Sequence, residues 1–282
     1  MLMTYTTLID TETVAAHLSD PAFVIIDCRY RLDDEEWGRR EYTARHVPGA
    51  VYAHLGRDLA GRKTGRNGRH PLPDADALAR TFGRFGISDT AQVVAYDQDN
   101  GMFGSRLWWL LRWLGHDAVA VLDGGFAKWI AERHRIASGE EARSPRTFMA
   151  KPRGEMVVGA DEVAARTGNP RSRLVDARAP ERFSGDIEPI DPVAGHIPGA
   201  VNYFFKKNLG EGDTFHSPDQ LRDQLSDVLA GVPPDHVVCY CGSGVTACHN
   251  LLALEHAGLR GARLFPGSWS EWSSDPTRPV ER

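Results

Sequence analysis

The chain has 282 residues and a formal net charge of −5, from 33 Lys and Arg against 38 Asp and Glu. At about 150 residues per domain, this length predicts two domains with a core each, and it excludes a peptide hormone or a disulfide miniprotein. Charged residues make up 25% and apolar residues 41%, which excludes a disordered acidic tail and a membrane bundle. The longest basic run is the pair Lys206 and Lys207, so we expect no nucleic-acid partner.

The amino terminus lacks the basic and apolar regions of a signal peptide, and no stretch approaches about 18 uninterrupted apolar residues. We therefore expect a cytoplasmic protein that makes no membrane contact. Besides Cys28, the cysteines Cys239, Cys241 and Cys248 crowd into ten residues, which suits neither a disulfide framework nor the paired spacings of a zinc site. We expect reduced thiols and no metal.

Four blocks of sequence occur twice in the same order. Two strand-like runs end in Asp-x-Arg, at Asp27 and Asp176, and two turns read His-Val-Pro-Gly-Ala and His-Ile-Pro-Gly-Ala, at His46 and His196. The other matched blocks are 93–97 with 237–241 and 123–129 with 266–272. Repeats this far apart indicate a duplicated domain rather than a solenoid.

Within each copy, β-rich runs alternate with helical patterns, which is typical of an α/β domain. The predicted elements are the strands 93–96 and 119–122 around the helix 106–114, and the strands 237–240 and 262–265 around the helix 245–257. This order predicts a mainly parallel sheet with helices on both faces. The polar, breaker-rich stretch after 137 predicts a linker. We expect domains at 1–137 and 155–282, joined by a linker at 138–154.

Cys241 stands where the strand 237–240 gives way to the following helix, in a loop that contains Gly242 and Gly244. Backbone N–H groups and the positive end of the helix dipole favour a thiolate at such a place. Helix N-termini lower the thiol pKa from about 8.5 to roughly 3.5–7.5. The sequence therefore predicts an accessible nucleophile at Cys241. The first copy has Asp97 at this position and lacks the nucleophile.

Two other classes of cysteine enzyme fit the sequence less well. Cysteine phosphatases need an arginine six positions after the cysteine to clamp the phosphoryl group, and this chain has Ala247 there. Papain-like chemistry needs a histidine base beside the cysteine. His70, His196 and His249 are available, and the sequence does not show which of them pairs with Cys241.

The duplicated blocks, the loop Cys-Gly-Ser-Gly-Val-Thr-Ala at 241–247 and the closing Gly-Ser-Trp-Ser-Glu-Trp at 267–272 resemble the tandem-domain rhodanese family over nearly the whole chain. The loop is similar to that of 3-mercaptopyruvate sulfurtransferases. The resemblance implies that Cys241 takes sulfur from a small-molecule donor, holds it as a persulfide and passes it to cyanide or a thiol, with thioredoxin as one candidate acceptor. It implies no cofactor.

The resemblance also implies roles for individual residues. Cys241 is the nucleophile, Ser243 is an assisting hydroxyl, and Arg182 binds the anionic end of the donor. His70 matches the amino-terminal histidine that approaches the cleft between the domains. The persulfide cradle is Gly242, Ser243, Gly244, Val245 and Thr246. His46 and His196 are expected to be structural, each bonding backbone near its Asp, and the tryptophans to pack core and interdomain surface.

The choice of donor is open between two anions. Mercaptopyruvate enzymes carry a second arginine nine residues after the first, where this chain has Asp191, and an expected acidic residue appears as Gly56 with Asp58 nearby. Thiosulfate-preferring members carry basic residues at the two positions after the cysteine, where this chain has Gly242 and Ser243. We favour 3-mercaptopyruvate, with thiosulfate as the alternative. Positive charge in place of the missing second arginine is available from Arg69, Arg178, Lys206 and Lys207.

A different class of function is a non-catalytic rhodanese-like binding module, since the first copy already lacks its cysteine. A carrier that passes a persulfide to one protein partner is a further alternative. The intact loop around Cys241 favours the enzyme, because a binding module does not need a thiol among converging N–H groups.

Overall fold

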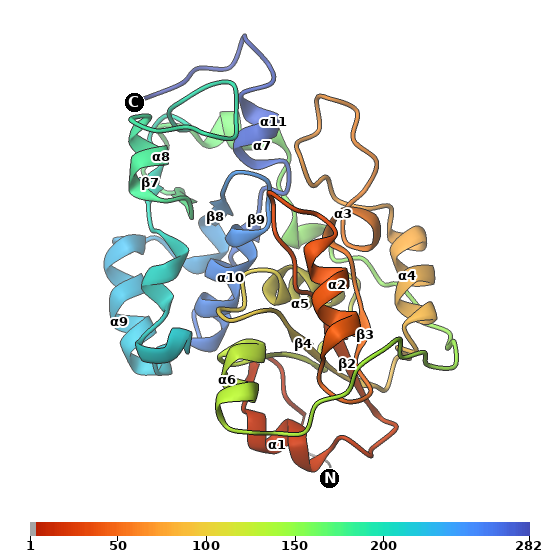
Figure 1. Ribbon diagram of the computed structural model, residues 1–282. Helices are drawn as coiled ribbons and strands as arrows, with labels where there is room; N and C mark the ends of the chain where they lie inside the picture. Colours follow the sequence, from red (N-terminus) through yellow and green to blue (C-terminus); the bar gives the residue numbers. More distant parts are fainter. Residues whose placement is uncertain (1–3) are drawn as a thin grey trace. The chain divides into compact units, whose positions relative to one another are not determined.

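The computed structural model describes residues 4–282, and the chain forms two compact units. The first unit comprises residues up to Gly61, Pro73–Arg153 and Glu211–Thr214. The second unit comprises Arg62–Leu72, Gly154–Gly210 and Phe215–Arg282. Each unit is an α/β structure around one parallel sheet, which confirms the predicted fold class (Figure 1).

The sheet of the first unit has five parallel strands in the order β1-β5-β4-β2-β3. Every residue of β2, β4 and β5 is buried, so both faces of the sheet are covered, as parallel sheets require. The strands are β1 (Leu8–Ile9), β2 (Phe23–Asp27), β3 (Val51–Tyr52), β4 (Gln92–Tyr96) and β5 (Val119–Leu122).

Helices α1 and α6 cover one face of this sheet, where Val14 and Trp129 join the core cluster of Ile25 and Val94. Helix α5 packs on the other face, with Gly104 close against Val121. The helices of this unit are α1 (Thr11–Ala16), α2 (Trp37–Ala44), α3 (Leu55–Asp58), α4 (Ala75–Arg84), α5 (Gly104–Trp113) and α6 (Gly125–Ala131), and the short 3-10 turn η3 (Glu211–Asp213) completes it.

The second unit repeats this plan with four parallel strands in the order β7-β6-β8-β9. Trp269 and Trp272 of α11 share a core cluster with Val163 of α7 and Val238 of β8, while α10 packs against β8 and β9. Its elements are β6 (Arg173–Asp176), β7 (Val201–Asn202), β8 (Val237–Tyr240), β9 (Arg263–Leu264), α7 (Ala160–Arg166), α8 (Pro180–Ser184), α9 (Pro218–Leu229), α10 (Thr246–His256), α11 (Ser268–Trp272), η1 (Gly154–Met156), η2 (Phe205–Asn208) and η4 (Pro234–His236).

The Asp-x-Arg blocks form the same buried ion pair in both units. Arg29 Nη2 lies 2.6 Å from Asp27 Oδ2, and Arg178 Nη2 lies 2.7 Å from Asp176 Oδ2. Each guanidinium also stacks on an aromatic ring of the covering helix, Phe126 at 4.2 Å and Trp269 at 4.9 Å from the ring centroid. The repeated pair therefore ties the end of a central strand to the helix that covers it.

The two turn histidines hold backbone, as expected of structural residues, although not beside the Asp residues. His46 Nδ1 lies 2.7 Å from the Tyr42 carbonyl oxygen, and His196 Nδ1 lies 2.8 Å from that of Phe183. Each imidazole also stacks on the ring of that partner residue. Tyr42 lies in α2 and Phe183 in α8, so each histidine binds the helix that precedes its own turn.

The division into units differs from the predicted boundaries at two places. The segment expected as a linker, 138–154, runs along the first unit as far as Arg153, with Arg146 N–H donating to Gly83 O at 2.9 Å and Lys151 N–H to Leu114 O at 2.9 Å. The segment 62–72, which sequence order assigns to the first domain, belongs to the second unit.

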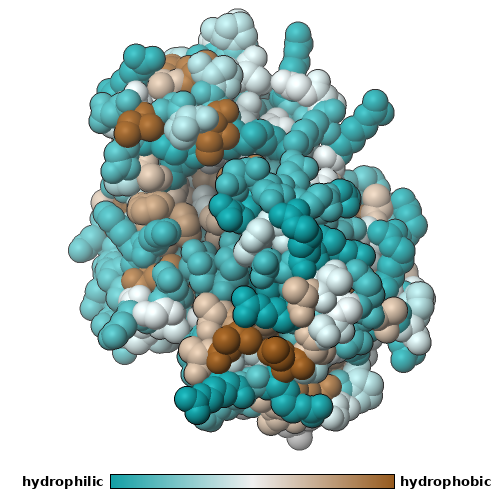
Figure 2. Space-filling view, in the orientation of Figure 1, coloured by the Kyte–Doolittle hydropathy of each residue, from teal (hydrophilic) through white to brown (hydrophobic). Residues whose placement is uncertain are grey.

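Large apolar side chains are mostly buried. Trp108, Trp109, Trp129, Trp269 and Trp272 are at most 1% exposed and fill the cores. Figure 2 shows a mainly hydrophilic face on which hydrophobic residues appear in a few small groups. None of the helices formed by residues 4–282 combines the length and the apolar character needed to cross a membrane.

Asp97 follows β4 and turns its carboxylate back onto the backbone of its own loop. It accepts N–H groups from Gly101 at 2.9 Å, Phe103 at 2.7 Å and Gly104 at 3.1 Å. Complete burial raises the pKa of this carboxyl to about 6, although these hydrogen bonds oppose the rise. The Asp97 carboxylate therefore occupies the site formed by the backbone N–H groups at the start of α5.

We predict that ionisation of Asp97 opposes folding between about pH 4 and 6. Its pKa is about 6 in the folded protein against 3.8 ordinarily, so the folded state binds the proton more tightly. The stability gained from protonation is present below about pH 4 and is lost as the pH rises through about 6. As the pH rises over this window, the free energy of unfolding of wild type should fall by about 3 kcal/mol relative to that of Asp97→Asn. Urea unfolding at several pH values measures it, and parallel curves would contradict the prediction.

Candidate active site

Cys241 lies at the carboxyl end of β8, directly before the loop that leads into α10. The strand is fully buried, so its register fixes where the cysteine leaves the sheet. Cys241 is only 2% exposed, which corrects the expectation of an accessible thiol. The reason is the close packing of the loop: residues 241–245 are all buried.

The loop is held by the backbone at the start of α11. Trp269 N–H donates to the Cys241 carbonyl oxygen at 2.9 Å, and Ser270 N–H donates to that of Gly242 at 3.0 Å. The Cys241 N–H in turn donates to Ser268 Oγ at 3.1 Å. Ser268 is a buried residue with φ +54°, a conformation that side chains seldom adopt. These contacts fix the position of the thiol before any substrate binds.

One backbone N–H of the loop points to the thiol sulfur. The Gly244 N–H points to Cys241 Sγ at 3.2 Å, while the Gly244 carbonyl oxygen accepts Cys248 Sγ–H at 3.2 Å. Gly244 has φ +76°, and a Cβ there would lie 2.3 Å from Pro266 O. A glycine is therefore required both by the backbone angle and by the space.

Ser243 is paired with a histidine from far away in the sequence. Ser243 Oγ lies 2.8 Å from His70 Nδ1, and the two residues are 6% and 5% exposed. Both belong to the second unit, because His70 lies in the segment 62–72. The other candidate histidines make their ring contacts elsewhere, His196 with Phe183 and His249 with Phe215.

Arg182, on α8, lies beside the loop in a network of buried carboxylates. Its Nη2 lies 2.8 Å from Glu188 Oε1 and 3.1 Å from Asp191 Oδ2. Asp191, which stands where the resemblance implies a second arginine, also forms an ion pair with Arg69. Sequence reasoning gave Arg69 only as one of several spare charges, and its place directly before His70 was the signal that could have singled it out.

Burial and hydrogen bonding shift the two carboxylates of this network in opposite directions. For Glu188, burial acts to raise the pKa, but hydrogen bonds from Arg182 and from the N–H groups of Asp191 and Ile190 outweigh it and lower the pKa. For Asp191, burial prevails over the attraction of Arg69 and Arg182, and the pKa is raised.

The other residues proposed as spare charge lie in different surroundings. Arg178 is buried in its pair with Asp176 and also bonds the Gly195 carbonyl oxygen at 2.7 Å. Lys206 is exposed, and Lys207 lies over the Tyr203 ring, 5.9 Å from its centroid. Asp58, in the first unit, accepts the His54 N–H at 2.9 Å and caps its own short helix.

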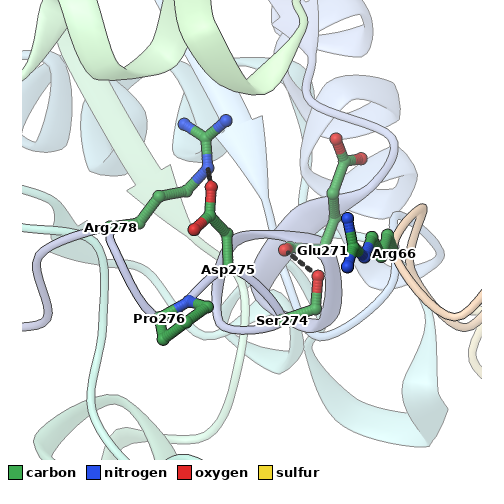
Figure 3. A pocket seen from close by; sticks show the side chains of 6 residues that line it. All are labelled: Arg66, Glu271, Ser274, Asp275, Pro276 and Arg278. Carbon is green, nitrogen blue, oxygen red and sulfur yellow. Dashed lines mark hydrogen bonds and ion pairs between the residues drawn. The ribbon is translucent and has the colours of Figure 1, made fainter.

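A separate pocket of about 300 Å³ in the second unit holds none of the predicted site residues. Arg66 and Glu271 line one side of it, and the ion pair of Asp275 with Arg278, 3.5 Å apart, lines the other (Figure 3). Two of its four charged side chains, those of Asp275 and Arg278, are therefore paired with each other. Across residues 4–282, three or more His, Cys, Asp or Glu side chains nowhere gather in a way that could hold a metal ion.

Comparison with known proteins gives one family. The model of the rhodanese-like domain matches residues 10–132 and 159–275. A probable 3-mercaptopyruvate sulfurtransferase of Pseudomonas aeruginosa is 48% identical over 97% of both chains. A putative thiosulfate sulfurtransferase of Mycobacterium tuberculosis is 42% identical over 92% of this chain and 90% of its own. A crystal structure of a 3-mercaptopyruvate sulfurtransferase from Escherichia coli has a TM-score of 0.83 at 29% identity, covering 94% of this chain and 99% of that one.

We predict that Gly244→Ala disables the site. The new Cβ meets Pro266 O, so the loop must shift, and a displacement of about 1 Å at reacting atoms costs roughly 100-fold in rate. Gly168→Ala is the matched control, because Gly168 has φ +74° but a Cβ there meets no atom of residues 4–282 within 4 Å, its chain neighbours aside. Sulfur transfer and thermal unfolding of both variants measure the difference. Equal activity in the two variants would show that the close contact does not matter.

Proposed function

The chain belongs to the rhodanese-like family, and on that premise we propose that it transfers sulfur from 3-mercaptopyruvate to a thiol or to cyanide through a persulfide on Cys241. The names of the relatives confirm the predicted family and the predicted class of enzyme, a sulfurtransferase. The choice of donor and the residue roles below are inferences from the geometry of the loop.

The first half-reaction needs a nucleophile and a proton. The Cys241 thiolate attacks the sulfur of the donor thiol, an S–S bond forms, and the C–S bond breaks with its electron pair going to carbon. The carbon that leaves takes up the proton of the donor thiol, so the products are pyruvate and the Cys241 persulfide anion. An acceptor thiolate or cyanide then attacks the outer sulfur and restores the Cys241 thiolate.

The observation that carries the choice of donor is the contact between Ser243 and His70 beside the nucleophile, 2.8 Å from Oγ to Nδ1. A hydroxyl joined to an imidazole can take a proton from the donor thiol and return it to carbon. Thiosulfate needs no such step, because it releases sulfite without a proton. The pair of Ser243 and His70 is therefore needed only for a donor whose sulfur is bonded to carbon, as in 3-mercaptopyruvate.

Thiosulfate is the second candidate donor, since relatives named for it align over most of this chain. The residues that follow Cys241 argue against it, because Gly242 and Ser243 bring no positive charge to a dianion. The acceptor class that the chemistry supports is a small thiol or cyanide. We infer that a thioredoxin-like protein is also a suitable acceptor, because its thiol can attack the outer sulfur of the persulfide as a small thiol does.

Steady-state sulfur transfer to cyanide, with each donor at matched concentrations, tests the proposal. Wild type should favour 3-mercaptopyruvate, and Cys241→Ser should be inactive with both donors. Ser243→Ala should lose roughly 100-fold or more with mercaptopyruvate, the usual worth of a proton-transfer group, but only a few-fold with thiosulfate. Ser274→Ala, outside the loop, is the control.

Each contrary result has one meaning. A preference for thiosulfate in the wild type would overturn the choice of donor in favour of the second candidate. A Cys241→Ser variant as active as wild type, with both rates feeble, would move the protein to the non-catalytic binding modules. Mass spectrometry of the donor-treated protein provides an independent check, because Cys241 should gain one sulfur atom.

A further inference from the structure

The separate pocket of about 300 Å³ beside α11 contains two charged side chains without a counter-ion. Arg66 and Glu271 line one side of it (Figure 3), and neither side chain makes a hydrogen bond or an ion pair with any residue that the structure describes. On the other side, Arg278 lies 3.5 Å from Asp275 and 2.8 Å from Asp161, so the charges there compensate one another. The pocket therefore offers a ligand one unpaired positive charge and one unpaired negative charge.

The turn that contains Arg66 is held by its own side chains. Asn67 Oδ1 accepts the Thr64 N–H at 2.8 Å, and Thr64 Oγ1 accepts the Arg66 N–H at 3.3 Å. Shortly after the turn the segment is fixed to α11, because the Arg69 N–H donates to Ser270 Oγ at 3.0 Å. The backbone around Arg66 is therefore anchored, while its exposed side chain can meet a ligand.

Glu271 reaches the pocket from the last turn of α11. Its carboxylate lies over Gly267, where a Cβ would have no room. Burial raises the pKa of this carboxyl, although the attraction of Arg278 opposes the rise. The matched position of the first unit is Lys128, whose side chain lies over Gly124 in the same way. Because the fold accepts a positive side chain at this position, it does not itself require the carboxylate of Glu271.

Two unpaired charges of opposite sign select the class of ligand. An inorganic anion would bind Arg66 but be repelled by Glu271, and a simple amine or metal ion would meet the reverse problem. A molecule that carries a carboxylate and an ammonium on neighbouring atoms satisfies both groups. Its side chain should be small and polar, because five of the six residues that line the pocket are polar or charged and the sixth is Pro276.

We propose that this pocket binds a free α-amino acid as its zwitterion, with the carboxylate on Arg66 and the ammonium on Glu271. A planar guanidinium matches the two oxygens of a carboxylate, and three ammonium protons can be shared between Glu271 and water. The inference goes beyond the proposed function and does not depend on it, since the pocket contains none of the residues assigned to sulfur transfer.

The bound amino acid joins two segments that both lead to the Cys241 loop. Arg66 precedes His70 by four residues, and Glu271 follows Ser270, whose N–H donates to the Gly242 carbonyl oxygen at 3.0 Å. Occupancy of the pocket therefore ties the segment 62–72 to α11 through side chains, in addition to the Arg69 backbone contact.

Calorimetric titration of the full chain with L-serine tests the site. The matched ligands are 3-hydroxypropanoate, which is serine without its ammonium, and ethanolamine, which is serine without its carboxylate. Wild type should bind L-serine at least about 10-fold more tightly than either, because each of the two leaves one charged side chain without a partner. Any other order of the three ligands, or no binding of L-serine, would overturn the proposal.

Two variants assign the charges. Arg66→Met should weaken L-serine binding about 10- to 100-fold, and in this variant L-serine and ethanolamine should bind alike. Glu271→Gln should weaken L-serine to a similar degree and remove its advantage over 3-hydroxypropanoate. Arg62→Met is the matched control, because Arg62 is an exposed arginine of the same segment that does not line the pocket. Binding in Arg66→Met as tight as in Arg62→Met would contradict the assignment.

Hydrogen exchange locates the bound ligand. L-serine should slow exchange of the N–H groups of 62–68 in wild type and Arg62→Met, but not in Arg66→Met. The rate of Cys241 alkylation gives the opposing outcome. Protection of Cys241 by L-serine that is equal in wild type and Arg66→Met would place the amino acid at the sulfur-transfer site and overturn the proposal.

Discussion

The hydrogen bonds between the Cys241 loop and the first turn of α11 are the contacts on which the site depends. Carbonyl groups at the end of a buried parallel strand must find donors, and Trp269 and Ser270 supply them to Cys241 and Gly242. The first unit solves the same problem in the same way, with Phe126 N–H on Asp97 O and Ala127 N–H on Gln98 O, both at 2.9 Å. Because both units contain these contacts, they are a property of the fold and do not depend on the cysteine.

The two copies differ in what the loop does with its N–H groups. In the first unit, the carboxylate of Asp97 accepts four of them within its own loop, from Asp99, Gly101, Phe103 and Gly104, so these donors are already occupied. In the second unit, the sulfur of Cys241 accepts one from Gly244 at 3.2 Å. The two loops also differ in length, because α5 begins seven residues after Asp97 and α10 begins five residues after Cys241.

Much of the fold could be predicted because its signals are local. Buried strands such as β4 and β8 read as short apolar runs, and Cys241 is recognisable because a strand, two glycines and a helix adjoin it in sequence. Arg69 and Asp191 escaped prediction as a pair, since 122 residues separate them and no periodicity links a loop in the first half to one in the second. His70 was found through the resemblance, but its contact with Ser243 spans 173 residues and required the structure.

The placement of 62–72 bears on how the two copies have evolved since duplication. This segment is encoded with the first copy but lies in the unit of the second, where it delivers Arg69 and His70. A gene divided between the copies would leave the cysteine on one product and these side chains on the other. The unit that contains Cys241 is therefore built from both halves of the sequence.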